Sequence, residues 1–196
     1  MNLSKLDLCN MALAMAGSSQ EIHALDYSEG ATVPNEARWC KRFWPLALAA
    51  VAREHNWKCL TARKDISAQI TTDPAFGYDA AYTLPADCAR VLGLEDSTLD
   101  WTVEGRRLLT DETTVKIAYV RESHETSLYD ALFAEALVMR LAAYLAHAIH
   151  PESDSSRADA LRAWHEKVSL PSAMRADAAE RSPVVIESST WKDSRL

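Results

Sequence analysis

The spacing of apolar residues changes twice along this chain, and the change limits the folds it can adopt. On both sides of residues 58–121, apolar residues recur every three or four positions, as on one face of an α-helix. Within 58–121 the apolar runs are short, partly alternating and separated by Pro and Gly, as in strands and turns. We therefore predict an α+β fold that is mainly a bundle of about four helices, with a small antiparallel β-sheet inserted between the second and third helices.

The helical pattern falls into four segments, at about residues 4–16, 34–55, 127–150 and 153–170. Ser4 can cap the first helix, and Asp7 three residues later completes a weak capping box. With the β-rich insertion at about 58–121, these helices are predicted to form one domain, residues 1–181. Residues 182–196 follow as an extended C-terminal tail.

Apolar stripes on the predicted helices indicate which side chains form the core. The stripe of the fourth helix comprises Ala158, Leu161, Trp164, His165 and Val168. Four tryptophans occupy or adjoin such stripes and are expected in the core: Trp39, Trp44, Trp57 and Trp164.

The longest apolar run, residues 128–150, is long enough to cross a membrane. Its charged residues Asp130, Glu135 and Arg140 fall on different sides of a helix. Each charge at mid-bilayer costs about 2.5 to 3.5 kcal/mol on the insertion scale. We therefore expect a helix of a soluble protein, covered by neighbouring helices, and no membrane partner.

Length and charge exclude some classes of function. A chain of 196 residues can bury a core without disulfide bonds or metals. Its formal net charge of −7 disfavours tight binding to a phosphate backbone, which requires clustered cations. The N-terminal apolar stretch contains Asp7, unlike a signal peptide, so we expect synthesis in the cytosol.

Cysteine and histidine spacings do not predict a metal or a cofactor. The four cysteines lie about 20 to 30 residues apart, so no pair has the C-x-x-C spacing of zinc and redox sites. His147 and His150 have a chelating spacing, but Pro151 follows at once and no third ligand is in register. We expect reduced, mostly buried cysteines, no metal and no cofactor.

The segment AYTLPADCARVLGL, residues 81–94, contains the strongest candidate for a nucleophile. Cys88 lies in it, and strand alternation places Arg90 on the same face, where a cation favours the thiolate. Such a site would make the protein a small cytosolic hydrolase or transferase. The competing interpretation treats Pro85 and Asp87 as a corner between two strands and Cys88 as a core residue. We favour the corner and predict no catalytic residue.

Two segments are candidates for contacts with other proteins. The tail contains apolar residues that nothing local can bury, and we expect them to dock on another chain: Val184, Val185, Ile186 and Trp191. Glu104 and Gly105 suit the turn of a tight hairpin. The basic pair that follows, Arg106 and Arg107, is a candidate contact for an acidic partner. A generic helical interaction module of the host cytosol would also present such surfaces.

Several segments, taken in order, resemble one family of viral proteins. They are LDLCNMALAMAG, EARWCKRFWPLALAAVAREHNWKCLTAR, FGYDAAYTLPADCARVLGL, WTVEGRRLLTDETTVKIAYV and LYDALFAEALVMRLAAYLAHAI, and they span about residues 3–170. The combination of LPADC with VEGRRLLTD at this spacing is the most specific part. In these segments the chain is similar to the tail tubular protein A family, the head-to-tail adaptors of short-tailed bacteriophages.

The resemblance implies a structural virion protein and not an enzyme. Family members form a ring, usually of twelve copies, beneath the portal protein. The ring carries the tail nozzle protein and in some phages helps to attach the tail fibres. DNA leaves through the middle without specific binding, and an acidic lumen would let it slide. The expected location is the neck and tail of the virion, after assembly in the host cytoplasm, and the family fold is a helix bundle with a β-rich insertion.

Overall fold

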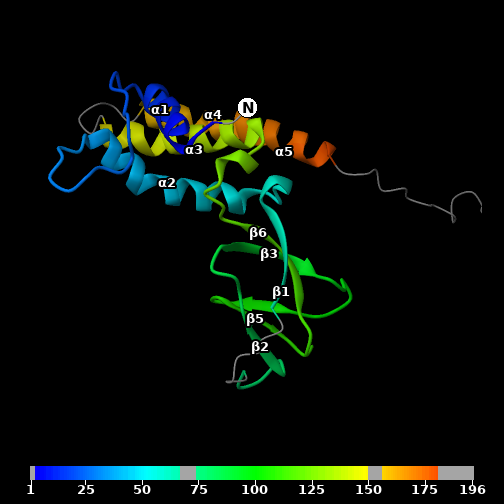
Figure 1. Ribbon diagram of the computed structural model, residues 1–196. Coiled ribbons are helices and arrows are strands. Elements are labelled where there is room, and N and C mark those ends of the chain that lie inside the picture. Colours follow the sequence, from blue (N-terminus) through cyan, green and yellow to red (C-terminus); the bar gives the residue numbers. More distant parts are fainter. Residues whose placement is uncertain (1–2, 67–73, 150–155, 181–196) are drawn as a thin grey trace, which may run out of the picture.

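The computed structural model describes residues 3–66, 74–149 and 156–180. Within them two helices come first, the strands follow, and the remaining helices come last (Figure 1). In chain order the elements are α1 (Lys5–Ala16), α2 (Asn35–Glu54), the 3₁₀ turn η1 (Lys58–Leu60), β1 (Thr61–Asp65), β2 (Ala80–Thr83), β3 (Cys88–Leu94), β4 (Thr102–Glu104), β5 (Arg107–Thr110), β6 (Lys116–Arg121), the 3₁₀ turn η2 (Thr126–Leu128), α3 (Ala131–Ile149), α4 (Ser156–Trp164), a π-helical turn (His165–Ser169) and α5 (Leu170–Ala179).

The predicted fold class is wrong. Helices account for 49% of the described residues and strands for 18%, and the strands form two three-stranded antiparallel sheets instead of one small sheet. The described part of the chain is a mixed α/β structure in which a helical bundle is not evident. The physical reason lies in α2, which packs on α3 and also contacts β3 and β6. Part of the helical surface is therefore covered by a sheet and not by another helix.

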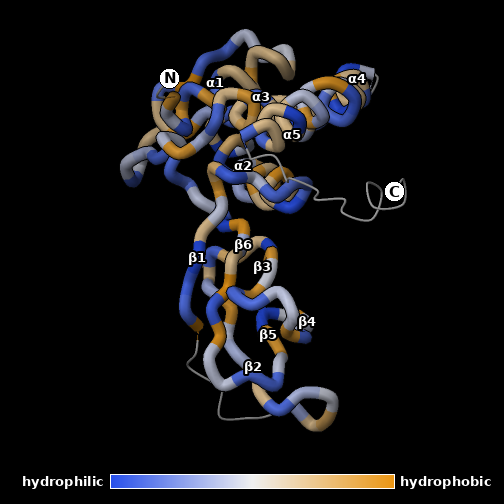
Figure 2. The backbone as a smooth tube through the Cα atoms, turned by 90° about the vertical axis from the view of Figure 1, so that its right-hand side faces the viewer, coloured by the Kyte–Doolittle hydropathy of each residue, from blue (hydrophilic) through white to orange (hydrophobic). Residues whose placement is uncertain are grey.

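The two sheets lie on the same side of the helices. Sheet A has the strand order β1–β6–β3, and sheet B has the order β2–β5–β4. In both views β6 and β3 lie nearest to α2 and β2 lies farthest away (Figures 1 and 2). The chain enters sheet A at β1, passes to β2 in sheet B, returns to β3 in sheet A, forms β4 and β5 in sheet B, and leads back to the helices through β6 of sheet A.

Strand β3 is irregular where it pairs with β6. Cys88 lies opposite Arg121 and Arg90 lies opposite Val120, so Ala89 is an extra residue on β3. Such a bulge changes the direction of side chains along a strand. Because consecutive residues of β6 point to opposite faces, Cys88 and Arg90 do not share a face of the sheet, and that prediction is wrong.

Two clusters of buried side chains hold the structure together. The larger cluster surrounds α3 and reaches sheet A through Ala89 and Val120. The smaller cluster lies between the sheets and includes Tyr82 from β2, Leu108 from β5 and Tyr119 from β6. Strands β3 and β6 contribute to both clusters, so these two strands are covered on both faces, whereas the end of β1 is exposed.

Helix α3 is the core helix of the larger cluster. Eleven of its 19 residues are buried, and α1, α2, α4 and α5 contact it. Among the described residues it is the helix long and apolar enough to span a membrane, with a mean hydropathy of 1.5. Core helices of soluble proteins pass the same test, and its contacts with four helices match the predicted cover by neighbours.

The sequence PAD forms the predicted corner between strands. The backbone N–H of Cys88 donates to the carbonyl oxygen of Pro85 at 3.0 Å, which closes the turn. The corner joins β2 of sheet B to β3 of sheet A. It therefore carries the chain from one sheet to the other.

Strands β4 and β5 form the predicted hairpin, shifted by one residue. Glu104 pairs with Arg107, so the loop is Gly105–Arg106 instead of Glu104–Gly105. Gly105 has a φ of +60°, and no described non-glycine residue has a positive φ. A positive φ at the first loop position alone is the pattern of a two-residue type II′ turn.

The predicted burial of the fourth helix is only partly correct. Ala158, Leu161 and His165 are buried, whereas Trp164 and Val168 are 51% and 42% exposed. In an α-helix each residue is rotated by about 100° around the helix axis, so Trp164 points about 90° away from the mean direction of the three buried residues. The π-helical turn then rotates Val168 farther away, because each turn contains more residues than in an α-helix.

Candidate functional site

Cys88 is a core residue between the two sheets. It begins β3, is 7% exposed and belongs to the smaller cluster. Burial raises the pKa of its thiol; the positive charges of Arg106 and Arg53 oppose that rise, and the carboxylates of Asp87 and Glu122 add to it. A reactive cysteine needs an exposed thiolate with a lowered pKa. The geometry therefore does not prepare Cys88 as a nucleophile.

We expect a thiol-directed reagent to label Cys88 at least about tenfold more slowly in the folded protein than in urea, because only an accessible thiolate reacts. Timed labelling followed by peptide mass spectrometry measures the rate at each cysteine. Cys59, which is only half-buried, provides an internal comparison; burial raises its pKa to about 11. Fast labelling of Cys88 in the folded protein would support the enzyme alternative.

The two adjacent arginines of the hairpin line different hollows. Arg106 lines a cavity of about 340 Å³ between α2, β3 and the hairpin. Its Nη2 donates to the carbonyl oxygens of Pro85 at 2.5 Å and Ala86 at 3.0 Å. Arg107 lines a separate hollow of about 470 Å³ beside sheet B. The two arginines therefore line different hollows, and a contact of either with another protein stays a prediction.

The hollow beside Arg107 also contains Phe76, which is 89% exposed. An exposed aromatic ring next to an arginine is typical of the energetically important part of protein interfaces. Phe76 was not predicted from the sequence. Phe76 lies between Pro74 and Gly77 and belongs to no helical or strand pattern of apolar residues. A large apolar residue in such a turn segment is the sequence signal that could have identified it.

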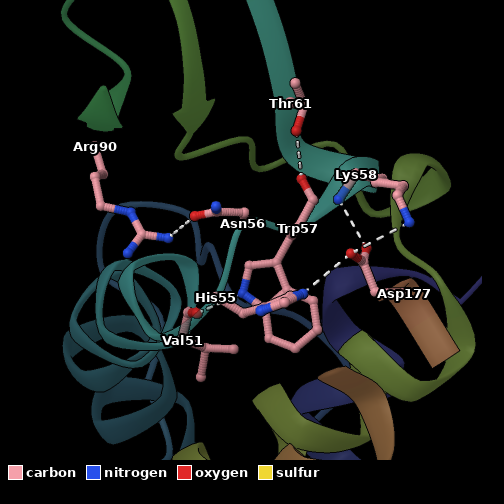
Figure 3. A network of polar contacts seen from close by, with 8 residues as sticks. All are labelled: Val51, His55, Asn56, Trp57, Lys58, Thr61, Arg90 and Asp177. Atoms are coloured by element: carbon pink, nitrogen blue, oxygen red, sulfur yellow. Dashed lines mark hydrogen bonds and ion pairs between the residues drawn. The ribbon is translucent and has the colours of Figure 1, made fainter. Parts of the chain in front are cut away.

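A polar cluster joins α5 to the end of α2 (Figure 3). Asp177 accepts a hydrogen bond from the backbone N–H of Lys58 at 2.8 Å, and its carboxylate lies 3.1 Å from His55 Nε2 and 3.8 Å from Lys58 Nζ. The Asp177 side chain is 12% exposed, so water screens these contacts little. Just after the end of α2, the side chain of Asn56 contacts sheet A, because Arg90 Nη2 of β3 donates to Asn56 Oδ1. These contacts hold α2, α5 and sheet A together.

His165 forms a second polar connection among the helices. It is fully buried and lies in the π-helical turn. Its Nδ1 is 3.1 Å from the carbonyl oxygen of Ala136, and its Nε2 is 3.0 Å from Glu54 Oε2. The other oxygen of Glu54 lies 3.7 Å from Arg140 Nη1. A single ring therefore connects α2, α3 and the last helical segment.

Exposed large apolar side chains on the described helices form two pairs, and Leu46 on α2 is exposed by itself. Met11 and Met15, one turn apart on α1, are 45% and 42% exposed. Trp164 and Val168, four residues apart around the start of the π-helical turn, form the second group. Beside α1 a hollow of about 420 Å³ is lined mainly by apolar residues of α1 and α3, including Met11 and Met139.

Some predicted residues lie outside the described part of the chain. These are Val184, Val185, Ile186 and Trp191 of the tail, and His150 of the histidine pair. Within residues 3–66, 74–149 and 156–180, no three His, Cys, Asp or Glu side chains are grouped as a metal site requires.

No protein family and no curated protein matches this chain.

Proposed function

We propose that this protein is a structural virion protein, a head-to-tail adaptor that forms a ring between the portal protein and the tail nozzle. The observation that carries the proposal is that the exposed apolar side chains of the protein lie in different places on its surface. One set lies on the helices, at Met11, Met15, Trp164 and Val168, and Phe76 lies beside sheet B. The resemblance of residues 3–170 to the tail tubular protein A family supports the same function.

A ring of identical subunits needs two different contact surfaces on each copy. Two pairs of exposed side chains supply them: Met11 and Met15 on α1, and Trp164 and Val168 at the end of α4 and in the π-helical turn. In this arrangement the helices form the ring. The hollow with Phe76 and Arg107 then remains available for the portal or the nozzle.

The net charge of −7 suits a protein through which DNA passes. Acidic side chains around a channel repel the phosphate backbone and keep the duplex from binding to the wall. The proposed ring therefore guides DNA during ejection without specific contacts to it.

Electron microscopy of the full-length protein mixed with the portal complex of its phage tests the proposal. We expect a ring stacked on the portal. Trp164→Asp should greatly reduce ring formation, because it places a charge in an apolar contact. Leu46→Asp is the matched control, since Leu46 is 54% exposed but lies in neither apolar pair. Failure of the unaltered protein to form rings or to bind the portal would contradict the proposal.

The tail is expected to contribute to portal binding. Deleting residues 182–196 should leave the fold intact and abolish binding to the portal, because the deletion removes Val184, Val185, Ile186 and Trp191. Circular dichroism measures the fold, and co-sedimentation with the portal complex measures binding. Undiminished binding of the truncated chain would remove the tail from the proposed interface.

A further inference from the structure

A basic cavity lies where α2 meets the two sheets. It measures about 340 Å³, and Arg53 from α2, Arg90 from β3 and Arg106 from the hairpin all line it. Trp101 and Cys88 form other parts of the wall, and no carboxylate lines the cavity among the described residues. Three arginines around one small space are unexpected in a protein with a net charge of −7.

Contacts within the chain hold each guanidinium group in position. Arg53 Nη1 donates to the carbonyl oxygen of Ala89 at 2.5 Å, and Arg106 donates to two carbonyl oxygens of the preceding corner. Arg90 Nη2 donates to Asn56 Oδ1 (Figure 3). A guanidinium group has five N–H donors. The three side chains are therefore fixed and still have donors for a ligand.

Arg90 also has a donor that the chain does not satisfy. Its Nε is buried and has no hydrogen-bond partner among the described residues. A buried N–H of a charged group costs free energy when it is left unpaired, and such groups are uncommon in folded proteins. This Nε has almost no accessible surface, so it lies out of reach of a ligand in the cavity and is not one of the donors available to it.

Two of the three arginines act electrostatically on Cys88. Burial raises the pKa of Cys88, and the guanidinium groups of Arg106 and Arg53 both act against that rise. Two arginines from distant segments are thus close enough to one thiol to influence its charge state. The acidic residues Asp87 and Glu122 also act on Cys88, but neither lines the cavity.

We propose that this cavity binds a small organic phosphate, with the phosphoryl group against the three arginines and an aromatic body against Trp101. A phosphate monoester has close to two negative charges and three acceptor oxygens, whereas a single carboxylate has one charge. Guanidinium groups match phosphate oxygens with paired hydrogen bonds. The indole ring provides a flat surface on which a nucleobase can stack.

The size of the cavity and the charge of the protein favour a mononucleotide over a nucleic-acid strand. A volume of about 340 Å³ lies at the small end of ligand-binding pockets. A strand would bring further phosphates against a protein whose net charge is −7, whereas one nucleotide places its charge at the arginines. This inference does not depend on the proposed ring.

Isothermal titration calorimetry of the full-length protein tests the inference with adenosine 5′-monophosphate, inorganic phosphate and adenosine as separate ligands. The nucleotide should bind saturably and more tightly than either of its parts. Arg106→Gln should weaken nucleotide binding roughly tenfold or more, because it removes a charge-assisted hydrogen bond. Trp101→Leu should weaken binding of the nucleotide but leave binding of inorganic phosphate unchanged.

Arg107→Gln is the matched control, since it removes the same charge from the same hairpin but outside the cavity. It should leave nucleotide binding unchanged. If Arg106→Gln unfolds the protein, as measured by circular dichroism, Arg53→Gln replaces it with the same expected loss. The inference is overturned by an absence of saturable nucleotide binding, by equal affinity for nucleotide and inorganic phosphate, or by an equal loss with Arg107→Gln.

Discussion

Replacing Trp57 with alanine should lower the free energy of unfolding by about 3 to 5 kcal/mol. Trp57 is 1% exposed, and its Nε1 donates to the carbonyl oxygen of Val51 at 2.6 Å. Its ring packs edge-on against Phe133, with the ring centroids 5.1 Å apart. The substitution opens a cavity in the larger cluster and removes these contacts. Urea denaturation followed by circular dichroism measures the loss.

Trp164→Ala is the control for that substitution. Both tryptophans were predicted from the sequence to lie in the core, but Trp164 is 51% exposed. Its replacement should cost less than about 1 kcal/mol, as for most surface positions. Equal losses at the two positions would contradict the burial described for them.

Replacing His165 with alanine should lower the free energy of unfolding by about 2 to 4 kcal/mol. The ring is fully buried and contacts Glu54 Oε2 at 3.0 Å and the carbonyl oxygen of Ala136 at 3.1 Å. Without the ring, the partly buried Glu54 carboxylate loses one of its two partners, and a cavity forms beside α3. Urea denaturation at neutral pH measures the change.

Two further variants separate the polar contact from simple loss of volume. Glu54→Gln keeps an acceptor oxygen for His165 Nε2 and should cost less than His165→Ala. Arg162→Ala alters an exposed ion pair with Asp159 and should change stability by less than about 1 kcal/mol. If His165→Ala leaves the free energy of unfolding unchanged, the buried ring does not stabilise the helices.

The helical and strand segments could be predicted because they depend on local patterns of residues. At the start of α1, Asp7 N–H donates to Ser4 Oγ at 3.1 Å and Ser4 N–H donates to Asp7 Oδ2 at 2.8 Å, which confirms the capping box. Pro85 and Asp87 likewise produce a corner through their own backbone preferences. Neither feature requires a residue far away in the sequence.

The arrangement of those segments could not be predicted in the same way. Whether six strands form one sheet or two depends on pairings between distant residues, such as Thr61 with Val120 and Ala80 with Thr110. The bulge at Ala89 also depends on the partner strand β6. The predicted bundle failed for this reason, because nothing local indicates that α2 contacts a sheet.

The candidate sites show the same limit. Arg106 and Arg107 are neighbours in the sequence, yet the hairpin directs them to different hollows. Arg53 and Arg90 belong to different segments and meet Arg106 only in the folded chain. Sequence patterns identified the hairpin pair but not the residues that gather around Arg106.

The β region is connected to the helices by two neighbouring strands, since β1 follows α2, β6 precedes α3, and the two strands pair along their length. A pull on sheet B against the helices therefore stretches β1 and β6 in the same direction. The load divides between two covalent chains. The hydrogen bonds between these strands are not sheared, because both strands move together. Through this paired connection, a force applied to sheet B reaches the helices before the strands β1 and β6 separate.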